Sequence, residues 1–156
     1  MSRHAAQPLP GSSRDVRPNL GILLRQLGQE VVRRVSTGLA EAGFDDVRPA
    51  HTAVFQHIQA DGSRLTDLAE RAQITKQSMG YLVDHLERCG YLERRADPAD
   101  RRATLICLTE HGWDEIKTAL AIIAAVEQEW ETQLGAQRLQ QLRELLTELG
   151  AASSTD

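Results

Sequence analysis

Two short helices joined by a tight turn, and then a β-hairpin, are predicted by residues 65–112, LTDLAERAQITKQSMGYLVDHLERCGYLERRADPADRRATLICLTEHG. Thr66 and Thr75 each precede apolar residues at helical spacing, so each hydroxyl is expected to cap a helix. Ile74 and Met79 have the spacing of a hydrophobic staple, and Met79 starts an apolar stripe along the second helix. The first half of the stretch therefore encodes a helix-turn-helix.

The hairpin follows Gly90, a residue type that commonly ends a helix because it adopts positive φ without strain. Residues 91–95 and 104–108 are predicted to be its two strands. A polar turn over residues 96–102, which includes Pro98, separates them. The turn ends in two arginines, so we expect a hairpin with a cationic tip.

Long amphipathic helices flank this middle region, residues 49–108. Apolar residues recur every three or four positions over residues 19–48 and again over residues 109–150, where two helices are expected. Residues 1–18 are rich in Pro, Gly and Ser, and residues 151–156 are polar, so both are predicted to be flexible ends. The expected fold is mainly α with one small β-hairpin.

Composition excludes several classes of protein. The chain has 156 residues, 41% hydrophobic and 26% charged, as expected for one ordinary domain. No apolar run approaches the roughly 18 residues of a membrane-spanning helix, and the N-terminus lacks the apolar segment of a secretory signal. We therefore expect a cytoplasmic protein. Cys89 and Cys107 are too few for a disulfide scaffold, and buried small hydrophobes are their expected roles.

Catalytic and metal-binding motifs are not recognised in the sequence. The five histidines lack the spacing of a zinc site, and neither a nucleophile motif nor a Gly-rich phosphate loop occurs. We therefore expect no metal, no cofactor and no enzymatic activity.

Charge is distributed unevenly along the chain. The net charge of -4 argues against a general binder of polyanions, and residues 110–156 alone carry 3 basic and 9 acidic side chains. Residues 88–102 nevertheless contain five arginines. Arginine clusters suit phosphates and base edges, although a solvated run of charge is the alternative interpretation.

The order of elements, a helix-turn-helix followed by an arginine-tipped hairpin, is typical of a winged helix-turn-helix that binds DNA. At the start of the second helix, Lys76 can donate to guanine, Gln77 can pair with adenine, and Ser78 can donate or accept. Tyr81, one turn later, can reach phosphate or a thymine methyl group. Gly80 is explained equally by a close helix crossing or by a closer approach of DNA.

The hairpin is expected to lie over the adjacent minor groove, where a negative potential attracts arginine. Arg101 and Arg102 are the candidates for this contact. Asp100 is near enough in sequence to hold one guanidinium in an ion pair. Alternatively, Asp97 and Asp100 form Asx turns that shape the loop, and we favour this role for Asp97.

These residues resemble the MarR (multiple antibiotic resistance regulator) family of bacterial transcription factors. The resemblance covers roughly residues 20–150 and is most specific in the wing, where Asp100 and Arg102 precede the strand and the motif Leu108-Thr109-Glu110-His111-Gly112. It implies a homodimer held by residues 19–48 and 109–150, which binds inverted repeats in double-stranded DNA, usually as a repressor. It also implies release from DNA when a small aromatic or phenolic ligand enters the cleft between the two regions.

The resemblance and the chemistry together give the candidate site residues. The DNA-binding candidates are Thr75, Lys76, Gln77, Ser78, Tyr81, His85, Arg95, Asp100, Arg101 and Arg102. The candidates for the ligand cleft are His51, Phe55 and Trp113. Two departures from the family pattern matter: Tyr81 and His85 stand where arginine is common, and Gln73 stands where the turn often has glycine. The alternative function is a winged-helix interaction or assembly module that no longer reads DNA.

Overall fold

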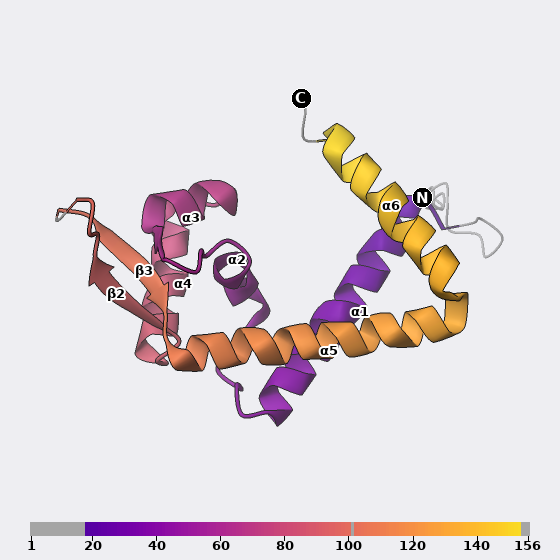
Figure 1. Cartoon of the computed structure of the whole chain (residues 1–156), viewed down its shortest axis with the longest axis horizontal. Coiled ribbons are helices and arrows are strands. Elements are labelled where there is room, and N and C mark those ends of the chain that lie inside the picture. Colours follow the sequence, from indigo (N-terminus) through magenta and orange to yellow (C-terminus); the bar gives the residue numbers. More distant parts are fainter. Residues whose placement is uncertain (1–17, 101, 154–156) are drawn as a thin grey trace, which may run out of the picture.

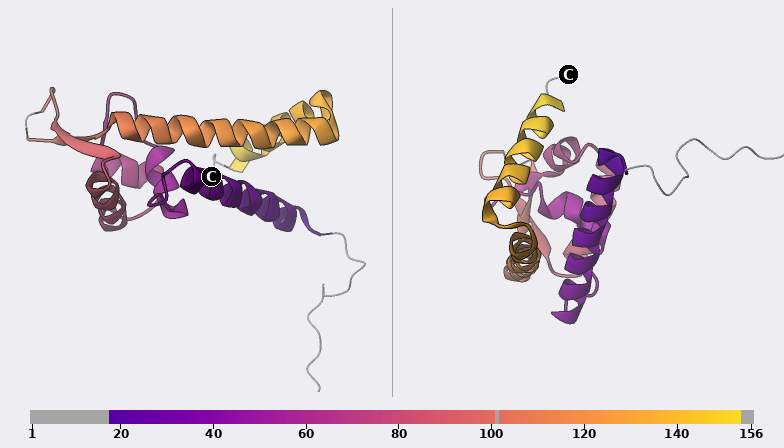
Figure 2. Two further views of the ribbon diagram at one scale, coloured as in Figure 1. Left: turned by 90° about the horizontal axis from the view of Figure 1, so that it is seen from below. Right: turned by 90° about the vertical axis from the view of Figure 1, so that its right-hand side faces the viewer.

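The computed structural model describes residues 18–100 and 102–153, which form a winged domain and a group of long helices (Figure 1). Helix α5 (Glu110–Leu134) extends along one edge of the molecule and connects the two parts. Helix α1 (Leu20–Glu41) crosses α5, and α6 (Ala136–Ser153) turns away from its end at Gly135, where φ is +84° (Figure 2). The fold is mainly helical with a small antiparallel sheet, as predicted.

The winged domain contains three strands rather than two. The order in the sheet is β1-β3-β2, and all pairs are antiparallel. The hairpin strands are within one residue of their predicted positions, whereas the two-residue strand β1 was not predicted. The domain consists of η1 (Pro49–His51), α2 (Thr52–Phe55), β1 (Ser63–Arg64), α3 (Leu65–Arg71), α4 (Lys76–Arg88), β2 (Leu92–Ala96) and β3 (Thr104–Leu108).

Apolar side chains from both helices and strands form the core of this domain. The predicted stripe of α4 faces inward, and Met79, Val83 and Leu86 are fully buried there. Ile74, before the helix, packs against the same core, as the hydrophobic staple requires. The other buried members are Leu39, Phe44, Val54, Leu68, Ala69, Tyr91, Leu92, Ile106 and Leu108.

The turn between α3 and α4 is fixed by backbone hydrogen bonds. Ile74 N–H donates to Ala69 O at 3.0 Å, and Gln73 N–H donates to Glu70 O at 3.0 Å, which is a Schellman motif. The motif requires a left-handed residue, and Gln73 has φ of +54°. Thr75 then caps α4 as predicted, because its hydroxyl accepts from Ser78 N–H at 3.1 Å.

Two helix boundaries differ from the sequence predictions. Thr66 does not cap α3, because β1 ends at Arg64 and the helix begins at Leu65, which places Thr66 inside the first turn. Helix α6 continues through Gly150 to Ser153, because glycine lowers helix stability by only about 1 kcal/mol and does not by itself end a helix. Residues 151–153 of the predicted tail are therefore helical, whereas the predicted N-terminal arm, apart from Pro18, lies outside the described residues.

The winged domain is fastened to α5 at the start of that helix. The Thr109 hydroxyl donates to Gly90 O at 2.6 Å and accepts from Gly112 N–H at 3.1 Å. A Cβ atom on Gly112 would lie 2.2 Å from Tyr91 O. Only glycine permits this approach of α5 to the backbone before β2. The Leu-Thr-x-x-Gly motif therefore fixes the orientation of the domain relative to the long helix.

Candidate nucleic-acid interface

The first turn of α4 presents polar side chains to solvent. Lys76, Gln77 and Ser78 are exposed, and 66% of the Tyr81 surface is accessible. Within the described part of the chain, Lys76 makes no side-chain hydrogen bond or ion pair, and the Gln77 amide donates to the Tyr81 hydroxyl at 3.3 Å. The first two turns of α4 therefore offer a free ammonium, an amide and a phenol, which are all able to meet phosphates or base edges.

Thr75 and Ser78 are partly engaged in shaping this turn. Besides the cap, the Thr75 hydroxyl donates to the Ser78 hydroxyl at 2.9 Å. Ser78 still has its own proton to donate. Thr75 thus positions the start of the helix, while Ser78 can both position it and contact DNA.

His85 lies farther along α4 and makes contacts inside the domain. Its ring is half-buried and stacks on His51, with the ring centres 4.7 Å apart. Its Nε2 lies 3.3 Å from Asp46 O and 3.6 Å from Cys89 Sγ. These contacts hold the His85 ring against the segment between α1 and η1.

The contacts around Gly80 decide between the two explanations for a glycine in this helix, a close helix crossing and a closer approach of DNA. Among the described residues, a Cβ atom at this position would meet only Leu65 Cδ2, at 4.0 Å, which is ordinary van der Waals distance. No close helix crossing therefore requires glycine here, and that explanation is wrong. A closer approach of DNA stays a prediction.

An ion pair that the sequence did not reveal holds the base of the wing. Asp97 is buried, and its Oδ2 accepts from Arg64 Nη2 at 2.7 Å and Nε at 3.2 Å. Its Oδ1 accepts from Ala99 N–H at 2.8 Å, which is the predicted Asx turn. The hydrogen bond from Arg64 lowers the pKa of Asp97. Asp97 therefore both shapes the turn and attaches it to β1.

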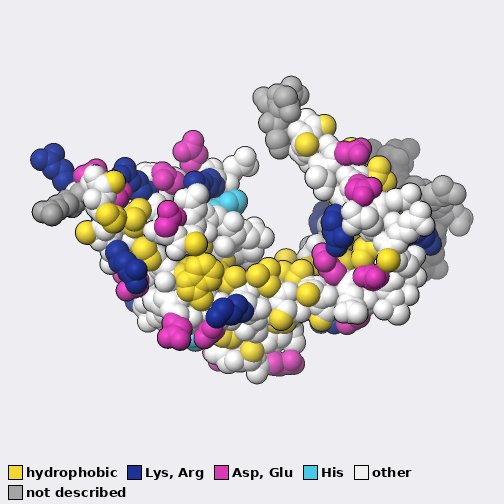
Figure 3. Space-filling view, viewed as in Figure 1, with side chains coloured by type: hydrophobic (Ala, Val, Ile, Leu, Met, Phe, Trp, Pro, Cys, Tyr) yellow, Lys and Arg dark blue, Asp and Glu magenta, His cyan; other side chains and the backbone are white. Residues whose placement is uncertain are grey.

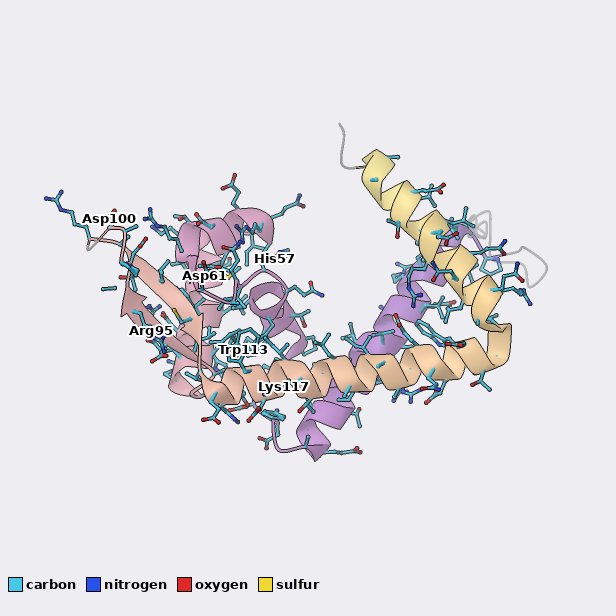
Figure 4. The ribbon with its side chains drawn as sticks, in the orientation of Figure 1. His57, Asp61, Arg95, Asp100, Trp113 and Lys117 are labelled. Carbon is cyan, nitrogen blue, oxygen red and sulfur yellow. The ribbon has the colours of Figure 1, made fainter. Side chains whose placement is uncertain are left out.

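Asp100 lies at the exposed end of the wing, where Figure 4 labels it. Its Oδ1 accepts from the backbone N–H of Arg102 at 3.1 Å, so that the contact with Arg102 is an Asx turn rather than the ion pair considered from the sequence. The Arg102 side chain is exposed. Arg101 lies outside the described residues.

The arginines of β2 are paired with acidic side chains. Arg94 binds Asp84 at 2.7 Å and also Glu87, so it ties β2 to α4. Arg95, labelled in Figure 4, is 63% exposed and pairs with Glu93 on its own strand. Figure 3 shows a cationic side chain, in dark blue, at the tip of the wing. Arg95 can leave its exposed pair for a phosphate at little cost, because surface ion pairs contribute about 1 kcal/mol or less.

A separate cavity of about 280 Å³ lies among α1, the η1–α2 segment and α5. Of the three predicted ligand residues, Phe55 lines it, whereas His51 and Trp113 do not. His51 is buried beside it, with Nδ1 accepting from Arg48 N–H at 3.0 Å, and burial lowers the pKa of His51 to about 4. Trp113 lies on the outer surface near the start of α5 (Figure 4).

Glu115 is a cavity residue that sequence reasoning missed. Its side chain lines the cavity but is only 3% exposed, and Oε2 has no hydrogen-bond partner among the described residues. Burial raises the pKa of this carboxyl group to about 7. The sequence spacing could have indicated that Glu115 points inward. Glu115 lies three residues after Gly112 and four before Ala119, which places it on the inner face of α5.

Comparison with known proteins identifies the family. The MarR family model matches residues 45–103. The HTH-type transcriptional regulator YdcH of Bacillus subtilis is 32% identical over 110 residues, which cover 69% of this chain and 75% of that protein. The chain belongs to the MarR family. Because MarR-family proteins are DNA-binding transcriptional regulators, this protein is a regulator and not an enzyme.

Solved structures of MarR-family regulators share the fold. The S. aureus MepR–DNA complex has a TM-score of 0.69 and 24% identity, and the match covers 87% of this chain and 99% of MepR. CouR from Rhodococcus jostii RHA1 bound to p-coumaroyl-CoA has a TM-score of 0.67 and 27% identity, over 88% of this chain and 95% of CouR.

Across residues 18–100 and 102–153, no helix is long and apolar enough to cross a membrane.

Proposed function

We propose that the protein is a homodimeric repressor that binds an inverted-repeat operator through α4 and the wing. The observation that carries this proposal is the exposed first turn of α4, with its unpaired Lys76. In this mode Lys76 and Gln77 read base edges in the major groove, and Ser78 and Tyr81 add base or phosphate contacts. Thr75 positions the turn.

The wing supplies the second DNA contact in this proposal. Arg102 and Arg101 reach the minor groove, and Arg95 binds the phosphate backbone. Asp100 orders the tip through its bond to the Arg102 backbone. The inward contacts of His85 support an indirect role for that residue, as a spacer between α4 and the segment before η1, rather than a base contact.

Exposed apolar side chains on the terminal helices support the dimer. Burying a leucine contributes about 1.5 to 3 kcal/mol, so a contiguous apolar surface favours association. A two-fold interface would place two copies of α4 about one helical turn of DNA apart. The exposed aliphatic residues are Leu20, Leu23, Leu24, Leu27 and Val32 on α1, Leu120 and Leu134 on α5, and Leu142, Leu145, Leu146 and Leu149 on α6.

The cavity supports ligand control of DNA binding. It lies where the winged domain meets α1 and α5, so a ligand there can change the distance between the two copies of α4. The solved structure of CouR with p-coumaroyl-CoA supports small-molecule binding in a protein of this fold. We therefore include relief of repression by a small aromatic ligand in the proposal.

Binding to the DNA beside the protein's own gene tests the function. Fluorescence anisotropy at near-physiological salt, with excess nonspecific competitor, should show nanomolar affinity. Lys76→Ala and Arg102→Ala should each weaken it by roughly tenfold. Lys117→Ala is the control of matched charge, because this exposed residue on α5 pairs only with Asp114 among the described residues. Failure to select any sequence from a random DNA library would instead favour the assembly-module alternative.

A further inference from the structure

In the part of the chain that the structure describes, the wall of the cavity is apolar except for a few groups, and only one of these is both ionisable and buried. Valine and leucine side chains from α1, Phe55 from α2 and Ile116 from α5 form most of the surface. Among the described residues that line it, two are titratable: Arg48, which is exposed, and Glu115, which is 3% exposed. The inner charge of the cavity is therefore acidic.

The unpaired oxygen of Glu115 carries a free-energy cost. A buried carboxyl oxygen without a hydrogen-bond donor loses its hydration and gains nothing in return. Burial raises the pKa of this carboxyl group, and among the described residues no cation pairs with it, Arg48 included. A ligand that brings a donor to Oε2 removes this cost on binding.

We propose that the cavity selects a lipophilic organic cation, a ring-bearing amine whose ammonium group pairs with Glu115 while its ring packs between α1, Phe55 and α5. The proposal rests on the function proposed above, because it names the ligand chemistry of the same cavity. It goes further by assigning a positive charge to the inducer. The volume of about 280 Å³ accommodates one or two fused rings.

Charge distinguishes this ligand from the other aromatic classes. An aromatic carboxylate would place a second negative charge beside Glu115, or would require Glu115 to stay protonated. A neutral alcohol or phenol satisfies Oε2 with one hydrogen bond but gains no ion pair. An ammonium gains both, and charge-assisted hydrogen bonds in a dry site are about twice as strong as neutral ones.

Three probes of matched shape test the assignment by calorimetry without DNA: 1-naphthylmethylamine, 1-naphthalenemethanol and 1-naphthoate. At mildly alkaline pH, where the amine is still protonated, we expect it to bind the full-length protein roughly tenfold or more tightly than the alcohol, and the naphthoate most weakly. Glu115→Gln should remove this preference while retaining binding of the alcohol. Thr52→Val is the matched control, because Thr52 lines the cavity without a charge.

The variants must be folded for this comparison, so circular dichroism and melting curves accompany each titration. Glu115→Met, which keeps the shape and removes all polarity, provides a second variant that should also lose the preference. Equal affinities of wild-type protein for the amine and the alcohol, tightest binding of the naphthoate, or no binding of the amine at millimolar concentration would each overturn the proposal. Failure of the operator assay alone would reject the proposed function and leave the cation site standing, because these titrations contain no DNA.

Discussion

Replacing Glu115 with glutamine should change how the stability of the protein depends on pH. Burial raises the pKa of Glu115 from 4.5 to about 7. Between these two values the folded protein holds a proton that the unfolded chain has released, so stability falls as pH rises. Glutamine has nearly the same shape and does not ionise. The destabilising contribution of Glu115 is therefore present in wild-type protein above pH 7 and disappears as pH falls toward 4.5.

The magnitude follows from the same two pKa values. Integrating the proton linkage from pH 5 to pH 8 gives a loss of stability of about 2 to 3 kcal/mol for the wild-type protein, which Glu115→Gln does not undergo. The free energy of unfolding of Glu115→Gln minus that of wild type should thus be about 2 to 3 kcal/mol larger at pH 8 than at pH 5. Any cost of burying the amide is the same at both pH values and cancels in this comparison.

Urea unfolding at both pH values, followed by circular dichroism at one fixed protein concentration, measures the effect. Glu70→Gln is the control, because Glu70 is an exposed acid on α3. The pH dependence of wild-type protein alone is not a sufficient test, because His51 also titrates differently in the folded and unfolded states. Burial lowers the pKa of His51 from 6.5 to about 4, so the contribution of His51 to stability is lost as pH falls through that range. Between pH 4.5 and 6.5 the two groups act in opposite directions. A Glu115→Gln difference that is the same at pH 5 and pH 8 would refute the reasoning.

Three further substitutions test the backbone and the wing. Gly112→Ala should lower the free energy of unfolding by about 3 kcal/mol, because the new Cβ would lie 2.2 Å from Tyr91 O. If urea unfolding shows a loss of less than about 1 kcal/mol, α5 shifts freely and the contact does not fix its position. Gly80→Ala should stabilise the free protein by about 1 kcal/mol in the same assay and should also weaken operator binding. Unchanged affinity for the operator would remove the close approach of DNA from the proposal. Asp97→Asn should weaken operator binding by roughly threefold to tenfold, since the wing must then be ordered on DNA. Asp61→Asn, at an exposed position (Figure 4), should leave anisotropy titrations unchanged.

Local signals predicted the winged domain well because its boundaries are set by neighbouring residues. The Thr75 hydroxyl reaches a backbone N–H three residues away, and Gly90 has φ of +82° next to the helix that it ends. Gln73 was noted as a departure from glycine, and its φ of +54° shows that the turn still needs the left-handed conformation. These features depend on contacts within a few residues, which a single sequence displays.

The features that the sequence missed depend on contacts between distant residues. Strand β1 is only Ser63 and Arg64, and it exists because it pairs with β3 some forty positions later. The prediction that Thr66 caps α3 was wrong for the same reason, because β1 leads directly into α3 and the helix begins at Leu65. The sequence predicted only a role in the turn for Asp97, because its ion-pair partner, Arg64, lies 33 residues earlier. No local pattern indicates that Asp97 rather than Asp100 pairs with an arginine of β1, and only the fold decides which carboxylate reaches that strand.

Helix α5 contacts the winged domain and also lines the cavity, and this arrangement provides a physical route between the two regions. At its first turn, Thr109 and Gly112 fasten the helix to the backbone around Gly90 and Tyr91. Glu115 faces the cavity three residues later. A ligand that pairs with Glu115 therefore acts on the same turns of helix that orient the winged domain. Linkage then requires that the operator weaken binding of that ligand by the same factor by which the ligand weakens binding of the operator.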